Sequence, residues 1–212
     1  MEMPADMSAI PAYPASGPAP APTGPTDEAL VRKLRDGDAH AGEMLVERHH
    51  RALLRYLQRL AGNEHLAEEL HQQTWISVLE HLDRFDPRGS PGGFKAWIFR
   101  IATNKANDLW RSRGREKAAH AGLRLVSDDE LPHAGARIED TEQHGRLKQA
   151  IEQLPDAQKQ VLMLRYYSGL KFNEIAEVVG CPLNTALGRM HKAVLKLREL
   201  LNDDGAPART RS

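Results

Sequence analysis

The stretch that most constrains the fold of this 212-residue chain is 171–201, which reads KFNEIAEVVGCPLNTALGRMHKAVLKLRELL. Its apolar residues recur at helical spacing in two blocks, which are separated by Gly180, Cys181 and Pro182. Glycine tolerates the left-handed conformation that ends a helix, and proline supplies a preset φ at the start of the next helix. The stretch therefore predicts two helices joined by a tight three-residue turn, which is the helix-turn-helix arrangement.

The second of these predicted helices has one broad apolar stripe, formed by Leu183, Ala186, Met190, Ala193, Val194, Leu197 and Leu201. Small Ala176 and Gly180, four residues apart, predict a close crossing with the first helix. The second helix of such a pair can lie in the major groove of DNA. The candidate DNA contacts point away from the stripe, and they are Asn184, Thr185, Gly188, Arg189, His191 and Lys192. A helical hairpin that binds no DNA remains the alternative.

The composition favours an all-α protein, because aromatic residues make up only 5% of the chain and Ala, Leu, Arg and Glu dominate it. No apolar run approaches the roughly 20 residues of a membrane span. The first residues lack both the basic and the apolar region of a secretory signal. Cys181 is the single cysteine, so no disulfide can form within one chain. These features predict a cytoplasmic protein with no membrane insertion.

Segments that contain the helix breakers Pro and Gly divide the chain into two small helical domains joined by a flexible linker. Residues 1–26 are Pro/Ala-rich and are expected to be disordered. Helices are expected at about 28–35, 41–61, 65–83 and 93–113, with Asp27 as the first N-cap and a loop at 86–93. Residues 114–140 are predicted to form an acidic linker. The second domain is expected over 141–201, and 202–212 is a tail.

The formal net charge is zero, but the charges are distributed unevenly. Residues 95–117 contain seven basic and two acidic residues, and residues 146–201 contain nine basic and five acidic ones. The segment between them, 118–145, has two basic and six acidic residues. Two basic blocks on either side of an acidic connector favour two DNA-contacting modules on a tether.

The predicted helix of about 93–111 has an apolar face formed by Phe94, Trp97, Ile98, Ile101, Ala102 and Leu109. The opposite face carries Phe99, Arg100, Thr103, Asn104, Asn107, Trp110 and Arg111. Aromatic rings interleaved with Arg and Asn suit unpaired bases, because rings stack on bases and Arg neutralises phosphate. Equally, Phe99 and Trp110 could pack against another helix, and the residues alone leave both interpretations open.

The predicted helix of about 65–83 presents Glu69, Gln72, Gln73 and Ile76 away from its apolar stripe. An isoleucine among carboxylates and amides suggests a protein-docking patch with an apolar anchor. A solvated face with one stray isoleucine is the simpler interpretation.

One pattern in the sequence is typical of an enzyme. Two Glu-x-x-His matches, Glu47 with His50 and Glu68 with His71, resemble half of the di-iron site of helical-bundle oxidases. Glu47 lies on the polar side of its predicted helix, so these groups are not expected to converge. No phosphate-binding Gly-rich loop or nucleophile elbow occurs. The sequence therefore predicts no catalytic residue, no metal and no cofactor.

Two segments resemble a known family. AEELHQQTWISVLEHLDRFDP followed by GGFKAWIFRIATNKANDLWRSR is similar to the core-binding and −10-reading region of bacterial RNA polymerase sigma factors. LPDAQKQVLMLRYYSGLKFNEIAEVVGCPLNTALGRMHKAVLKLRELL is similar to their −35-reading region. The small size resembles the extracytoplasmic-function (ECF) group of the sigma-70 family. The resemblance covers about 27–113 and 141–201.

This resemblance implies a function in transcription initiation. The patch of Glu69, Gln72, Gln73 and Ile76 would dock on the β′ clamp helices of core RNA polymerase, and the C-terminal domain would lie on the β flap. The 86–93 loop and the next helix would hold the melted −10 strand. Its contacts would be Phe99, Arg100, Asn104, Asn107, Asp108, Trp110 and Arg111. The second helix of the helix-turn-helix would read −35 promoter DNA. An anti-sigma factor is a possible further partner of this group.

The chain departs from the family pattern at three positions. Gln73 stands where an acidic residue is usual, and Leu187 and Gly188 stand where Lys and Ser are frequent. Leu187 is expected either to pack in the core or to touch a thymine methyl. The alternatives to a sigma factor are a helix-turn-helix regulator that acts without polymerase docking and, more remotely, the di-iron oxidase.

Overall fold

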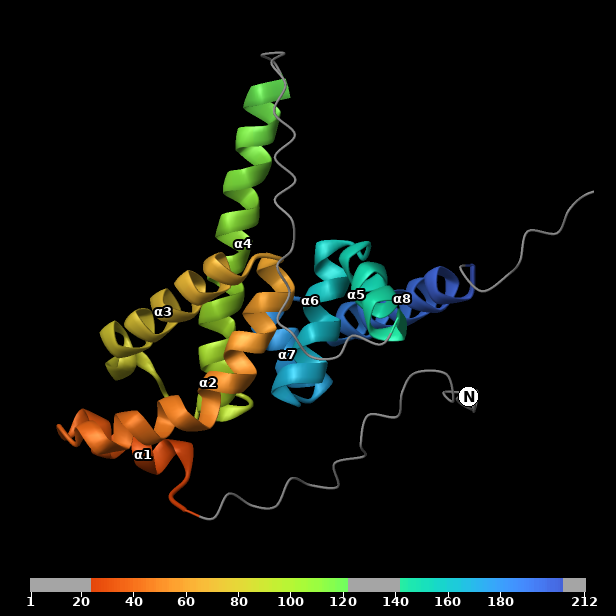
Figure 1. Ribbon diagram of the computed structural model, residues 1–212. Helices are drawn as coiled ribbons and strands as arrows, with labels where there is room; N and C mark the ends of the chain where they lie inside the picture. Colours follow the sequence, from red (N-terminus) through yellow and green to blue (C-terminus); the bar gives the residue numbers. More distant parts are fainter. Residues whose placement is uncertain (1–23, 122–141, 204–212) are drawn as a thin grey trace, which may run out of the picture.

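The computed structural model describes residues 24–121 and 142–203, and every regular element in these ranges is helical, as predicted (Figure 1). The N-terminal module contains α1 (Asp27–Arg35), α2 (Ala39–Ala61), α3 (Glu64–Glu80), the 3₁₀ turn η1 (Leu82–Arg84) and α4 (Gly93–Ala121). The C-terminal module contains α5 (Glu142–Glu152), α6 (Asp156–Met163), the π-helical turn η2 (Leu164–Ser168), α7 (Phe172–Val179) and α8 (Leu183–Asp203). The expectations for residues 1–23, 122–140 and 204–212 lie outside the described residues.

The first helix begins one residue earlier than expected. Thr26, not Asp27, is its N-cap, and its hydroxyl accepts a hydrogen bond from the Ala29 amide at 3.3 Å. The Asp27 carboxylate instead binds His49 Nε2 at 2.8 Å and the Arg48 guanidinium. Burial raises the pKa of Asp27, but its hydrogen bonds with His49 and Arg48 outweigh burial and lower this pKa below its ordinary value. Asp27 therefore ties α1 to α2.

The fourth helix is longer than expected, because it continues past residue 113 to Ala121. A single glycine, Gly114, costs a helix only about 1 kcal/mol relative to alanine. Strong helix formers follow that glycine in Arg115, Glu116, Lys117, Ala118 and Ala119. The predicted linker therefore begins inside α4.

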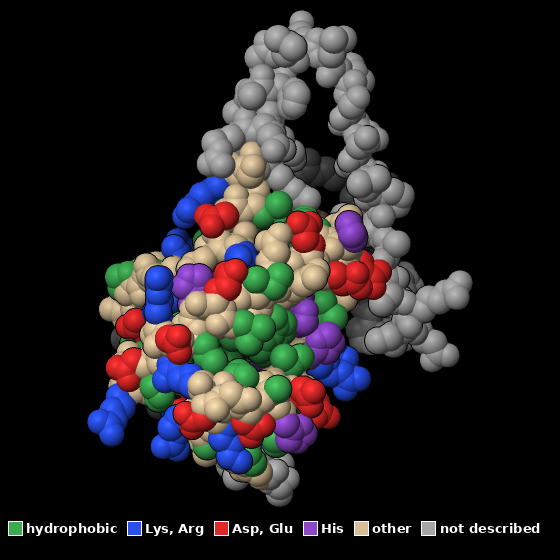
Figure 2. Space-filling view, turned by 90° about the vertical axis from the view of Figure 1, so that its left-hand side faces the viewer, with side chains coloured by type: hydrophobic (Ala, Val, Ile, Leu, Met, Phe, Trp, Pro, Cys, Tyr) green, Lys and Arg blue, Asp and Glu red, His purple; other side chains and the backbone are tan. Residues whose placement is uncertain are grey.

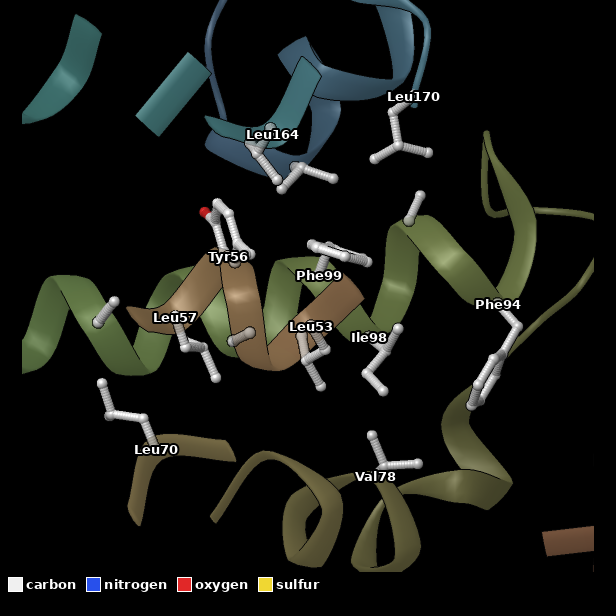
Figure 3. Close-up of a cluster of buried hydrophobic side chains, with 14 of the residues drawn as sticks. Leu53, Tyr56, Leu57, Leu70, Val78, Phe94, Ile98, Phe99, Leu164 and Leu170 are labelled. Atoms are coloured by element: carbon white, nitrogen blue, oxygen red, sulfur yellow. The ribbon is translucent and has the colours of Figure 1, made fainter. Parts of the chain in front are cut away.

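The core of the N-terminal module lies between α2, α3 and α4. Figure 3 shows Leu53 and Leu57 of α2 beside Ile98 of α4, with Leu70 and Val78 of α3 facing them. The guanidinium of Arg35, at the end of α1, donates to the carbonyls of Leu82 and Phe85, the latter at 2.6 Å. These bonds fix η1 at the entrance to the loop that precedes α4.

The two modules pack against each other through one continuous hydrophobic core. Leu164 of η2 and Leu170 face Tyr56 of α2 and Phe99 of α4 across the module boundary (Figure 3). These four side chains are at most 3% exposed. In Figure 1, α7 lies beside α4, while α6 and η2 contact α2. The C-terminal module therefore covers one side of the N-terminal module.

The predicted helix-turn-helix is present as α7 and α8. Gly180 adopts φ +65°, and the Cys181 amide donates to the carbonyl of Ala176 at 3.0 Å. A Cβ added at Gly180 would meet no atom within 4 Å. The expectation that Gly180 permits a close helix crossing is therefore wrong, because this glycine serves the left-handed turn.

Candidate nucleic-acid and protein interfaces

The predicted −10 contacts on α4 do not share one environment. Asn104, Asp108 and Arg111 are exposed, whereas Asn107 and Trp110 are half-buried. Arg111 Nη1 lies 3.3 Å from Asp108 Oδ1 one turn away, in an exposed ion pair. Trp110 packs against the hydrophobic core. The three exposed candidates are polar, and they include one acidic and one basic residue.

Phe99 corrects the sequence interpretation. It was expected on the DNA-facing side, but its side chain is 0% exposed. Its ring packs against Tyr56 with the centroids 5.3 Å apart, and the Tyr56 hydroxyl lies 2.8 Å from Thr103 Oγ1. Complete burial raises the pKa of Tyr56, so its hydroxyl stays neutral and available to this bond.

The error has a geometric cause. Residues Phe99, Ala102, Thr103 and Ala106 follow one another at steps of three, one and three, so they form a second buried face of α4. This face meets α2 and the C-terminal module, while the expected face meets the remainder of the N-terminal core. A helix that is buried on two sides has no single apolar stripe, so a division into one buried and one exposed face does not describe α4.

Two predicted −10 contacts, both half-buried, touch the C-terminal module. Asn107 Oδ1 accepts a hydrogen bond from Gln160 Nε2 at 2.9 Å. Arg100 Nη2 lies 3.8 Å from Glu177 Oε2 of α7. Nearby, Lys95 Nζ donates to the carbonyl of Ser168 at 3.2 Å. The basic face of α4 is therefore partly occupied by polar groups of α6, η2 and α7.

The loop at 86–93 is held in one shape by local bonds. The Arg88 amide donates to Asp86 Oδ1 at 2.9 Å, and the Gly93 amide donates to the Ser90 carbonyl at 2.9 Å. Gly92 and Gly93 have φ of +78° and +62°. A Cβ at Gly92 would lie 2.8 Å from that of Ala96, so only glycine fits there. Arg35 anchors the start of this loop, and no motif in the sequence indicated that role.

The predicted docking patch is exposed on α3. Glu69, Gln72 and Gln73 face solvent, and Ile76 is 47% exposed. Gln73 Nε2 donates to Glu69 Oε1 at 2.9 Å, which orders the polar end of the patch. Leu79, which the sequence analysis did not single out, is 59% exposed one turn after Ile76. Figure 2 views the side of the molecule that carries α3 and shows hydrophobic side chains gathered on it.

Two further features border this patch. A groove of about 310 Å³ separates α3 from α4, and its lining includes Glu69 and Gln73 on one side and Lys105 and Asp108 on the other. Trp75 Nε1 donates to His71 Nε2 at 3.1 Å, and burial together with nearby His50 lowers the pKa of His71 to about 4. His71 is therefore a neutral acceptor at pH 7, and its hydrogen bond orients the Trp75 ring.

The −35 candidates lie along the N-terminal half of α8. Asn184, Thr185, His191 and Lys192 are exposed, while Gly188 and Arg189 are half-buried. From residue 183 to 198 the helix carries four basic residues and no acidic one. This surface has the charge that a phosphate backbone requires.

The apolar stripe of α8 is narrower than predicted. Ala186, Ala193 and Leu197 are buried, but Leu183 is 44% exposed. Leu187 is 42% exposed, which excludes a core position for it. The assignment of Leu183 to the core is wrong: it is the first residue of α8, and helical spacing alone does not show whether the end of a stripe is covered.

The two Glu-x-x-His matches meet at their histidines, but they do not bring a set of metal ligands together. The rings of His50 and His71 meet edge to face with centroids 4.7 Å apart. Within residues 24–121 and 142–203, no three His, Cys, Asp or Glu side chains are grouped closely enough to hold a metal ion. In the same part of the chain, no helix combines the length and hydropathy that crossing a membrane requires.

Comparisons with known proteins agree with this arrangement. The family descriptions that match are Sigma-70 region 2, over residues 45–116, and Sigma-70 region 4, over residues 144–197. The ECF RNA polymerase sigma factor ShbA of Streptomyces griseus is 33% identical over 184 residues, covering 81% of this chain and 93% of its own. SigW of Bacillus subtilis, another ECF sigma factor, is 29% identical, covering 82% and 95%.

Solved structures show the same fold. The sigma factor CnrH, in complex with the cytosolic domain of CnrY, has a TM-score of 0.63 at 26% identity and covers 84% of this chain and 98% of its own. The sigma factor RpoE of Bartonella quintana, in complex with the anti-sigma factor NepR, has a TM-score of 0.60 at 27% identity, covering 76% and 96%. The chain belongs to the sigma-70 family. Within that family it is a member of the ECF group.

Proposed function

We propose that this chain binds core RNA polymerase and directs it to promoters that share a −10 and a −35 element. The observation that carries the proposal is the presence of both sigma regions in one chain, each with its candidate contact surface on a helix. The patch of Glu69, Gln72, Gln73, Ile76 and Leu79 on α3 would dock on the β′ clamp helices. The C-terminal module would lie on the β flap.

Promoter opening would use the N-terminal module. Holding a base outside the duplex costs a few kcal/mol, so a preformed site is an advantage. The 86–93 loop, fixed by Arg35 and two left-handed glycines, would supply such a site at the start of α4, and Asn104, Asp108 and Arg111 would extend the contact surface further along that helix. Duplex reading at −35 would belong to Asn184, Thr185, Arg189, His191 and Lys192 of α8. The chain supplies no catalytic group of its own, since the polymerase makes the phosphodiester bond.

One solved relative is bound to an anti-sigma factor and another to the cytosolic domain of CnrY, which supports an anti-sigma partner for this chain. Its place of action would be the cytoplasm, where promoter DNA and polymerase meet. A helix-turn-helix regulator without polymerase docking would use α8 in the same way. The docking patch on α3 therefore distinguishes a sigma factor from such a regulator.

The test is co-purification of the full chain with core RNA polymerase. We expect a stable one-to-one complex that survives gel filtration. A chain that binds duplex DNA but elutes apart from the core enzyme would contradict the proposal and favour the regulator.

A further inference from the structure

Two exposed leucines stand in the N-terminal half of α8, next to the candidate DNA contacts, and a third, Leu195, is exposed further along the helix. Leu183 and Leu187 are 44% and 42% exposed and four residues apart, so they lie one above the other on the helix. Asn184 and His191 flank them, and both are exposed. Large apolar side chains on an otherwise polar and basic surface indicate an apolar feature on the partner.

The surrounding residues restrict what that partner can be. The helix carries basic residues and no acidic residue from 183 to 198, which favours a polyanion. In the major groove, the apolar feature on a base edge is the methyl group of thymine. Gly188 has no side chain, and a Cβ there would point into open space. The helix backbone next to Leu187 is therefore free to approach the bases closely.

We propose that Leu187, supported by Leu183, selects thymine at one or two positions of the −35 element through its methyl group. This inference rests on the proposed reading of −35 DNA by α8, and it assigns a specificity that the polar residues do not supply. Lysine or arginine at this position would favour guanine, whose N7 and O6 both accept hydrogen bonds.

Replacing thymine by deoxyuridine removes the methyl and nothing else. The −35 duplex is first selected from a random pool by the chain assembled with core RNA polymerase. Each thymine of that duplex is then changed singly to deoxyuridine. We expect an affinity loss of about fourfold at one or two positions, the effect of one buried methyl.

The matched variants are Leu187→Ala and Asn184→Ala. Leu187→Ala should bind thymine and deoxyuridine duplexes equally, whereas Asn184→Ala should bind both more weakly and keep the difference between them. Equal affinity for both bases at every position in the unmodified chain would overturn the proposal. A difference that persists in Leu187→Ala would overturn it as well. Failure to bind core polymerase would instead contradict the proposed function.

Discussion

Ile76→Asp is expected to lower the affinity of the chain for core RNA polymerase at least 100-fold, and Leu79→Asp should act in the same direction. Both side chains are large, apolar and about half exposed on α3, as anchors of a docking surface are. The substitution removes an apolar contact of about 2 kcal/mol and places a carboxylate where its desolvation is uncompensated. Gel filtration or fluorescence anisotropy with labelled chain measures the loss.

The matched control for this prediction is Ile76→Leu, which keeps an apolar side chain of the same size and should bind within a few-fold of the original. Because about half of the Ile76 side chain is already in solvent, the free energy of unfolding of Ile76→Asp should lie within about 1 kcal/mol of that of the unmodified chain. Unchanged polymerase affinity in a folded Ile76→Asp chain would show that this face of α3 is not the docking surface.

Phe99→Ala is expected to reduce the free energy of unfolding by about 3–5 kcal/mol. The ring is fully buried against Tyr56 at the meeting point of α2, α4 and the C-terminal module. Since natural domains are stable by only about 5–15 kcal/mol, this loss removes a large part of the total. Urea denaturation followed by circular dichroism gives the value.

The comparison for Phe99→Ala is Asn104→Ala on the exposed side of the same helix. Asn104→Ala should change stability by less than about 0.5 kcal/mol while weakening binding of single-stranded −10 DNA. If Phe99→Ala left stability unchanged and weakened only DNA binding, Phe99 would be a stacking platform, and its burial in the structure would not describe the free chain.

These two residues show where sequence reasoning succeeds and fails. Helical periodicity located the two helices of the helix-turn-helix, and Gly180 and Pro182 located the turn between them. Both signals act on the local backbone, so a single sequence is enough to detect them. The exposed position of Ile76 followed from the same periodicity. Leu79 was missed, although it lies three residues after Ile76 and outside the apolar stripe of α3. Helical spacing therefore already placed it on the same exposed face as Ile76.

Other features have no local signature. The burial of Phe99 depends on the side of α4 that the C-terminal module covers, and that contact joins residues more than 60 positions apart. Arg35 binds carbonyls 47 and 50 residues away, and any exposed arginine has the same local context. Such roles arise from tertiary packing, which determines the second buried face of α4 and the anchoring of the 86–93 loop.

The central claim, that this chain gives promoter specificity to RNA polymerase, is tested most directly by run-off transcription on fragmented genomic DNA from the encoding organism. Purified core enzyme, with and without the chain, is supplied with nucleotides, and the 5′ ends of the transcripts are sequenced. The account predicts a set of starts that require the chain, share one −10 and one −35 element, and disappear with Ile76→Asp. A transcript pattern that is the same with and without the chain would contradict it.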